Sequence, residues 1–380
     1  MKKLLRALAL LLPLSSAISA DYEAAAKYLE ACNGHAMLVY EKGSLVFERY
    51  FNGHTAEKPH LLASGTKSFS GFMAVAAQED GLLTLDEKVS ETITEWKEDA
   101  QKQAITIRQL LSLSSGIAGG ENGSVPSYKA AVAAAKVTAP PGKRFQYGPI
   151  PYQIFGELMQ RKLTASGKAK DPLDYLQQRL FTPIGMKYEL WREDAEKRPH
   201  LPSGAFFTAR EWAKFGLFLL QKGSWGGKTI VKPESLAECF KPSSTNPSYG
   251  MTFWKARPRD PIPDLVMAAG KGKQKLFIIP SRQLLIVQFA DAEPRYRENR
   301  FLSLALGDPS IDTAAVSSDG DALPTRAEQN FRLLDKNGDG SLSREEAGTQ
   351  PFFTPADADQ NGTLTREEVA AYVKKLGRVR

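Results

Sequence analysis

A serine and a lysine three residues apart, Ser64 and Lys67, form the pattern Ser-x-x-Lys. A helix brings positions i and i+3 onto the same face, so the lysine amine can reach the serine hydroxyl. A serine hydroxyl is a poor nucleophile unless a neighbouring group takes its proton, and a lysine does so only where burial or nearby cations lower its pKa. The pattern predicts either a serine nucleophile with its base or a capped helix whose lysine faces solvent.

Two twelve-residue segments, which begin at Asp335 and Asp357, repeat a second pattern with chemical meaning. Oxygen-bearing residues at positions 1, 3, 5, 7 and 12 and a glycine at position 6 are typical of an EF-hand calcium loop. Dockerin modules also pair calcium loops, but glutamate at position 12 in both favours EF-hands. The sequence predicts two calcium sites, and a protein partner for the pair is one further possibility. The expected ligands are Asp335, Asn337, Asp339, the Ser341 carbonyl and Glu346, and then Asp357, Asp359, Asn361, the Thr363 carbonyl and Glu368.

Other nucleophilic and metal-dependent schemes find no support in residue spacing. No Gly-x-Ser-x-Gly segment occurs. His35 lies in a hairpin pattern, His54 and His60 in a loop, and His200 in a proline-rich turn. These histidines lack His-x-His or His-Glu-x-x-His spacing, and a lone histidine is more often structural, so a zinc hydrolase is not expected.

The elements that must position Ser64 come from both ends of a large domain. Alternating apolar and polar residues over 36–51 predict a β-hairpin that turns at Lys42-Gly43. Apolar residues at helical spacing predict a helix from Ser64 to Gly81. Further helices are predicted at 106–113, 151–163, 171–180 and 208–223, and a three-stranded meander at 264–291. The expected fold class is α+β: an antiparallel sheet covered by helices plus a helical domain, followed by a small all-α EF-hand domain.

Composition divides the chain into four parts. Residues 1–20 carry cations, then an apolar stretch and then small residues, which indicates a secretory signal peptide and a periplasmic or secreted protein. Residues 21–306 form the large domain, 307–322 a flexible linker with few large apolar residues, and 323–380 the EF-hand pair. No other segment approaches the roughly 20 apolar residues of a membrane span.

Charge bears on the expected binding partners, and cysteine content on the expected disulfides. The formal net charge is +7, part of it from the first twenty residues, and no run of Lys or Arg marks a nucleic-acid surface. Nucleic acid is therefore not an expected partner. The two cysteines, Cys32 and Cys239, allow either one disulfide or two free buried thiols.

Several segments, in order, resemble class C β-lactamases, DD-peptidases and related esterases. Residues 64–93 resemble the nucleophile helix of that group and its following segment, and 105–117 and 140–159 resemble its next two motifs. The likeness covers roughly residues 30–295. It implies a β-lactamase/transpeptidase-like fold and a serine hydrolase that forms an acyl-enzyme without a cofactor.

The resemblance also implies roles for particular residues. Ser64 corresponds to the acylated nucleophile, Lys67 to its proton partner, and Tyr147 to a second base. The backbone N–H of Lys271, after Gly270, corresponds to one half of an oxyanion hole whose other half is the Ser64 N–H. For Tyr147 the alternative is an aromatic side chain that merely packs at a loop edge.

Two positions depart from the pattern of the family. Pro149 stands where an asparagine is expected, and Ala268 stands where a cation opens the Lys/His-Thr/Ser-Gly triplet. Efficient β-lactam hydrolysis is therefore not expected, although Lys271 or Lys273 could restore the charge if either is not solvated. The sequence predicts an exported hydrolase of an ester, amide or small peptide. The alternative is a catalytically inactive protein that binds cell-wall material or a protein partner.

Overall fold

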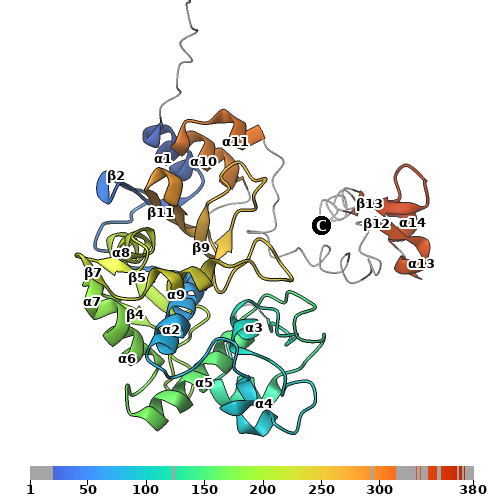
Figure 1. Ribbon diagram of the computed structural model, residues 1–380. Helices are drawn as coiled ribbons and strands as arrows, with labels where there is room; N and C mark the ends of the chain where they lie inside the picture. The colour runs from blue at the N-terminus through green and yellow to red at the C-terminus, as the bar shows by residue number, and fades with distance from the viewer. Residues whose placement is uncertain are drawn as a thin grey trace, which may run out of the picture. The chain divides into compact units, whose positions relative to one another are not determined.

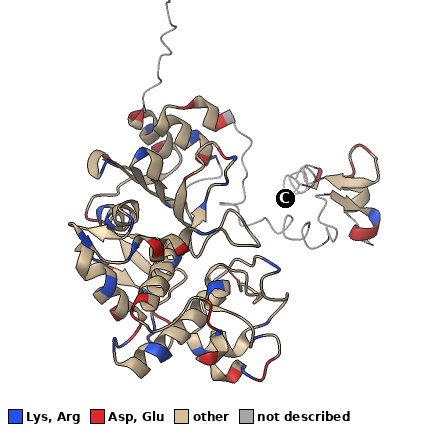
Figure 2. Ribbon diagram, viewed as in Figure 1, with Lys and Arg blue, Asp and Glu red and all other residues tan. Residues whose placement is uncertain are grey.

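The computed structural model describes residues 20–121, 125–291, 295–313, 341–348 and 352–365, together with 331, 334, 368, 369 and 372. The chain divides into two compact units, residues 1–316 and 317–380. Within the described ranges, no helix has the length and apolar character needed to cross a membrane. Acidic and basic residues are interspersed along the described helices and loops of the first unit (Figure 2).

A six-stranded antiparallel sheet forms the centre of the first unit, in the order β2-β1-β11-β10-β9-β8 (Figure 1). The predicted hairpin turns at Lys42 and Gly43, whose φ angles are 49° and 83°. The predicted meander supplies β9, β10 and β11, so strands from both ends of the unit meet at β1 and β11. The strands are β1 Gly34–Glu41, β2 Ser44–Tyr50, β8 Trp254–Lys255, β9 Val266–Gly270, β10 Gln274–Ile279 and β11 Leu284–Ala290.

Helices cover both faces of this sheet. As a result, every residue of β10 and β11 is buried. Phe277 of β10 stacks on Phe301 of α10 (Glu298–Leu306), with ring centroids 5.8 Å apart. Its neighbour in sequence, Ile278, pairs with Leu285, which packs against α8 (Ala209–Leu220). Successive side chains alternate between faces, so α10 and α8 lie on opposite sides (Figure 1). Helix α1 (Tyr22–Ala31) packs beside α10.

The remaining helices and short strands of the first unit lie mostly between β2 and β8 in sequence. The predicted helix at Ser64 begins as a 3₁₀ turn, Ala63–Lys67, before α2 (Ser68–Glu79). The predicted helix 171–180 is divided between α6 and a π-helical turn at Gln177–Phe181. The others are α3 Ile107–Leu111, α4 Tyr128–Ala134, α5 Ile150–Ser166, α6 Pro172–Leu176, α7 Thr182–Ile184, α9 Pro233–Ala237, β3 His60–Leu61, β4 Leu190–Trp191, β5 Ala205–Phe207, β6 Ser224–Trp225 and β7 Lys228–Thr229, with β3-β5-β4 forming a small sheet.

The structure corrects the start of the predicted linker. Residues 307–313 belong to the first unit, where α11 (Pro309–Thr313) follows α10 directly. Ile311 is 1% exposed. Asp312 forms ion pairs with Arg297 and Arg300 of the first unit. One buried apolar side chain and one paired carboxylate hold this segment against the first unit. The overall composition of the segment does not reveal these two contacts.

Of the two alternatives for the cysteines, the structure shows two free thiols. Cys32 and Cys239 are both buried and free.

In the second unit, β12 (Ser341–Ser343) and β13 (Thr363–Thr365) pair antiparallel with Leu342 opposite Leu364, so the EF-hand region contains a short sheet in addition to helices. Both leucines are fully buried. The described helices there are α13 Arg344–Ala347 and α14 Phe353–Ala356.

Candidate active site

The structure brings Ser64 and Lys67 into direct contact. In the 3₁₀ turn that holds them, side chains three residues apart are eclipsed. The Lys67 Nζ donates hydrogen bonds to Ser64 Oγ and to the Pro202 carbonyl oxygen, each at 2.9 Å. Ala63, just before the serine, has φ 47°, a left-handed conformation that costs a non-glycine residue free energy and is common at functional sites. The lysine therefore does not face solvent.

Burial changes the acid–base properties of Lys67. The residue is only 3% exposed, and removal from water lowers the pKa of its amine to about 7. Two aromatic rings flank the amine, with the Nζ 5.1 Å from the ring centroid of Tyr147 and 5.3 Å from that of Tyr152. Near neutral pH a large fraction of this lysine is uncharged, so it can accept a proton from the serine.

Neighbouring strands and a tryptophan fix the turn that carries Ser64. The Leu62 N–H donates to the Ala205 carbonyl at 2.9 Å, and the Ala205 N–H donates to Thr66 Oγ1 at 3.2 Å. Trp212 of α8 packs against Gly65, where a β-carbon would lie 3.1 Å from its ring. The serine is held from both sides, by β5 and by α8, so its position does not depend on a flexible loop.

Tyr147 lies in a loop that is closely packed against another loop. The Ile150 N–H donates to the Gly119 carbonyl at 3.0 Å, and a β-carbon at Gly148 would lie 2.1 Å from the same oxygen. The Tyr147 ring stacks on Trp254, with centroids 5.5 Å apart. Tyr147 is therefore both a packed loop aromatic and a neighbour of the Lys67 amine, which combines the two interpretations that the sequence left open.

Pro149 occupies the N-cap of α5, where its carbonyl accepts from the Tyr152 N–H at 3.1 Å. The amide that the family carries at this position is absent, but a buried glutamine lies one helical turn on. Gln153 Nε2 donates to the Pro126 carbonyl at 2.6 Å, and its Oε1 accepts from the Leu201 N–H at 3.4 Å. Gln153 thus supports the segment whose Pro202 carbonyl holds Lys67.

Gly270 lets the end of β9 approach the serine turn. A β-carbon there would lie 2.0 Å from the Leu62 carbonyl oxygen and 3.1 Å from the Gly65 nitrogen, so a larger residue would displace the backbone. The side chain of Lys271 is exposed. The Lys273 ammonium lies 5.6 Å from the ring centroid of Tyr296. The backbone of Gly270 therefore lies beside the serine turn, as an oxyanion-hole strand requires.

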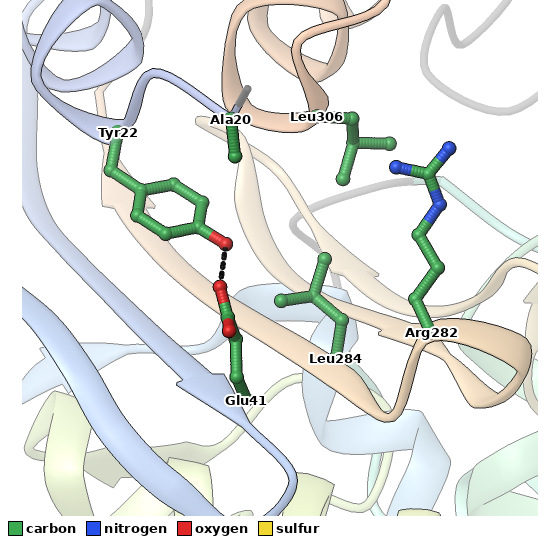
Figure 3. Close-up of a pocket in the computed structure, with 6 residues that line it drawn as sticks. All are labelled: Ala20, Tyr22, Glu41, Arg282, Leu284 and Leu306. Atoms are coloured by element: carbon green, nitrogen blue, oxygen red, sulfur yellow. Dashed lines mark hydrogen bonds between the residues drawn. The ribbon is translucent and has the colours of Figure 1, made fainter. Parts of the chain in front are cut away.

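A pocket elsewhere in the first unit is separate from this site. Figure 3 shows its lining, in which the Tyr22 hydroxyl donates to Glu41. Glu41 pairs with Leu284, at the end of the sheet opposite Gly270 in strand register. This pocket therefore contributes nothing to the Ser64 site. Its lining residues are Ala20, Tyr22, Glu41, Arg282, Leu284 and Leu306.

In the second unit, the expected ligands of the second calcium loop converge. Carboxylate oxygens of Asp357, Asp359 and Glu368 all lie within 4.8 Å of one another. Asp357 Oδ1 is buried and has no hydrogen-bond partner among the described residues, which leaves it available to a cation. Hydrogen bonds from the N–H and hydroxyl of Thr365 lower the pKa of Glu368, so this carboxylate is ionised at neutral pH. Asn361 and Thr363 lie in the same loop.

The structure describes only part of the first calcium loop. Ser341 lies on β12, and Glu346 in α13 accepts hydrogen bonds from the N–H and hydroxyl of Ser343 at 3.0 and 2.8 Å. The other three expected ligands, Asp335, Asn337 and Asp339, lie outside the described residues.

Three functional contacts have no signal in the sequence. The Pro202 carbonyl is a backbone group, and nothing in the residue type marks it as the second acceptor for Lys67. In the sequence Tyr152 is one of several apolar residues of its helix, and in the structure its hydroxyl pairs with that of Tyr249 at 2.7 Å. The role of Gln153 depends on contacts to two distant loops. The sequence shows only that Tyr152 lies in the first turn of the helix that follows Tyr147.

Comparison with known proteins gives two family matches. Residues 23–307 match the Beta-lactamase family, and residues 329–346 match the EF hand family. Protein flp from Staphylococcus aureus (strain MW2) is 23% identical over 186 residues, which are 44% of this chain and 36% of that protein. The match thus spans only about a third of the length of this curated relative.

Solved structures share the fold of the first unit. A putative 6-aminohexanoate-dimer hydrolase from Bacillus anthracis superposes with a TM-score of 0.61 at 24% identity, covering 76% of this chain and 80% of the other. A putative β-lactamase from Bacteroides dorei DSM 17855 gives 0.63 at 20% identity, covering 78% and 98%. The family match covers most of the chain and includes the turn that carries Ser64 and Lys67. The chain therefore belongs to the Beta-lactamase family.

Proposed function

We propose that this protein hydrolyses an ester, amide or small peptide through an acyl-enzyme on Ser64. The observation that carries the proposal is the hydrogen bond between the Ser64 hydroxyl and a buried lysine whose pKa is lowered to about 7. A lysine of ordinary pKa, ~10.4, would be fully protonated at neutral pH and could not take the serine proton.

The proposed reaction begins when the neutral Lys67 amine takes the Ser64 proton as Oγ attacks the substrate carbonyl. The N–H groups of Ser64 and Lys271 stabilise the resulting oxyanion. As the tetrahedral intermediate collapses, the proton passes to the leaving group, with Tyr147 beside Lys67 to relay it. Water then attacks the acyl-enzyme, its proton is taken by the same groups, and the acid product leaves with Ser64 restored. No metal is needed for these steps.

Uncharged acyl groups are the proposed substrates, because the strand beside the site offers Ala268 and Ala269 where a cation and a hydroxyl would bind a carboxylate. Lys273 lies over Tyr296, and the Lys271 side chain is exposed. We therefore expect kcat/KM for p-nitrophenyl butyrate to exceed that for nitrocefin, a carboxylate-bearing cephalosporin.

A matched pair of esters isolates the carboxylate. p-Nitrophenyl butyrate and p-nitrophenyl hemisuccinate share a leaving group and differ by a terminal acid group in an acyl chain of similar length. We expect the neutral ester to be hydrolysed faster at saturating calcium. A larger kcat/KM for nitrocefin or for the hemisuccinate would show that a cation recognises the acid group, and the interpretation of Ala268 would be wrong.

We also propose that the protein is exported and that its C-terminal unit binds two calcium ions. The cationic and apolar pattern of residues 1–20 supports export to the periplasm or beyond. The converging carboxylates of Asp357, Asp359 and Glu368 support a calcium ion in the second loop, as does Asp357 Oδ1, which has no hydrogen-bond partner within the described part of the chain. Asn361 and the Thr363 carbonyl complete its ligands, and the Glu346 loop would hold the other ion.

Calcium is expected to stabilise the C-terminal unit with little effect on hydrolysis. Extracellular EF-type sites bind at ~10⁻⁴ to 10⁻³ M, and a hundredfold excess over the dissociation constant stabilises a fold by about 2.7 kcal/mol. Differential scanning calorimetry should show a separate transition of this unit that moves to lower temperature with EDTA, while ester hydrolysis persists. Without metal, the clustered carboxylates repel one another.

Variants identify the ligands responsible. The double variant Glu346→Gln with Glu368→Gln should mimic EDTA, because each change weakens the bidentate ligand of one loop. Glu345→Gln, an exposed neighbour that is not at a ligand position, is the matched control and should respond to calcium like the wild type. Loss of hydrolysis in EDTA at a temperature where the first unit stays folded would instead make calcium regulatory.

A further inference from the structure

Three of the four histidines meet at one end of the central sheet. His35 lies on β1, His54 on the loop after β2, and His60 on β3, and their ring centroids are 5.4 to 5.7 Å apart. Asp291, immediately after β11, joins them, with its Oδ2 3.4 Å from His35 Nε2. Residues far apart in sequence thus form one cluster of nitrogen and carboxylate donors.

The donor atoms are spaced as ligands of one small cation would be. One ring nitrogen each of His35 and His60 and one carboxylate oxygen of Asp291 all lie within 4.8 Å of one another. Ligands at ~2.0 to 2.2 Å in a tetrahedral zinc site lie about 3.3 to 3.6 Å apart. The His35–Asp291 separation already matches this value, and small side-chain rotations would bring His60 to it.

Hydrogen bonding prepares His60 for metal binding. Its Nδ1 lies 3.1 Å from the Leu61 carbonyl oxygen, which can only accept, so Nδ1 carries the proton. The lone pair is then on Nε2. A ligating histidine typically donates its other N–H to a backbone carbonyl or carboxylate in this way, which fixes both tautomer and ring orientation.

His54 supplies a second, independent indication. The residue is only 7% exposed, and its Nε2 is buried without a hydrogen-bond partner among the described residues. A buried polar atom without a partner is costly, and native proteins rarely leave one unless a water or ion completes it. Its ring centroid lies 5.7 Å from those of His35 and His60, so the ring borders the cluster, although its nitrogens are not among the three donor atoms that lie within 4.8 Å of one another.

The surrounding residues hold the cluster in place. Phe289 stacks on the His60 ring at 5.0 Å and meets the His54 ring edge-on at 6.1 Å. Asn33 anchors the strand end, since its Nδ2 donates to the Asp291 carbonyl at 3.0 Å. The register of β1 shifts between Gly34 and Ala36, a bulge of the kind that re-aims a side chain. His35 and His60 are therefore carried by strands, and Asp291 directly follows the end of a third strand.

We propose that the first unit binds one zinc ion through His35 Nε2, His60 Nε2 and the Asp291 carboxylate, with the fourth position open to water or, after rotation of its ring, to His54. Imidazole donors select zinc and similar ions over calcium or magnesium, so this site differs in chemistry from the C-terminal loops. The ion ties together β1, β3 and the end of β11. His60 is four residues before Ser64, so the site braces the strand that leads into the serine turn. The inference does not depend on the proposed hydrolysis.

The test uses the full chain without a histidine tag, stripped of metal and kept in saturating calcium so that the EF-hand loops are occupied. Titration with zinc chloride by calorimetry should give one ion per chain. Cobalt(II) should give the intense visible bands of a four-coordinate ion with nitrogen ligands, whereas a six-coordinate oxygen site gives weak ones. Absence of zinc binding by the wild-type chain would overturn the proposal.

Two variants and two controls locate the site. Asp291→Asn, at a position whose side chain is 67% exposed and therefore safe for folding, should weaken zinc binding at least about tenfold, and His60→Gln should do the same. His200→Gln, which changes the one histidine outside the cluster, and Glu346→Gln with Glu368→Gln should keep wild-type zinc affinity. Undiminished binding in Asp291→Asn, or its loss in the EF-hand variant, contradicts the assignment.

Discussion

Replacing Ser64 with alanine is expected to reduce kcat/KM for p-nitrophenyl butyrate by at least about 10⁴-fold, to the background of the assay. The hydroxyl is the atom that carries the acyl group, so no other residue can substitute for it. The folded state should hardly change, because the hydroxyl is only partly buried and Lys67 keeps its bond to the Pro202 carbonyl. Initial rates and thermal unfolding, measured on the same preparation, separate the two effects.

Ser44→Ala is the matched control, since Ser44 is exposed at the start of β2 and lies far from the site in sequence. It should retain wild-type kcat/KM and the same melting temperature. Activity of Ser64→Ala within severalfold of the wild type would remove the serine from the mechanism, whatever the remaining contacts of the turn.

Replacing Lys67 with methionine or arginine is expected to lose nearly as much activity as the serine change, and the losses should not add, because the two residues act as a unit. Arginine keeps a positive charge but cannot deprotonate near neutral pH, so it separates charge from basicity. In the wild type, kcat/KM should rise with pH through about 7, as the Lys67 amine loses its proton. A pH profile with no inflection near neutrality would contradict a lysine base.

The same lysine should leave a signature in stability. Its pKa is about 7 in the folded protein and ~10.4 when unfolded, so between these values the unfolded chain binds the extra proton. The free energy of unfolding therefore rises with pH across this window, by up to about 1.4 kcal/mol per pH unit, and the stabilisation is lost again as the pH falls towards 7. Lys67→Met should lack this slope. Denaturant titrations of both proteins at several pH values give the difference, and parallel curves would mean that the lysine is not buried as a base.

Local patterns in the sequence were sufficient for much of the fold. Alternation over 36–51 and the turn at Lys42-Gly43 gave the hairpin, since both depend on neighbouring residues. The predicted pairing of Ser64 with Lys67 needed only three residues of separation. The composition of 307–313 misled because a single buried side chain, Ile311, outweighed the polar residues around it.

Long-range contacts explain what could not be predicted. The Pro202 carbonyl reaches Lys67, and the Gln153 amide reaches the neighbouring Leu201, only after segments far apart in sequence fold together. The close approach of Gly270 to Leu62 depends on where β9 ends relative to the serine turn. The histidines show the limit most clearly, because metal motifs are recognised by short spacings, whereas His60 meets Asp291 across 231 residues of sequence only after the sheet has closed.

Labelling with a fluorophosphonate probe tests the central claim most directly. The probe phosphonylates an activated serine, so intact-protein mass spectrometry of the wild-type chain should show one adduct, and peptide mapping should place it on Ser64. Ser64→Ala and Lys67→Met should remain unlabelled, and Ser44→Ala should label like the wild type. A correctly folded wild-type chain that takes up no probe, or that carries it on another residue, would contradict the assignment of Ser64 and favour a protein that binds without catalysis.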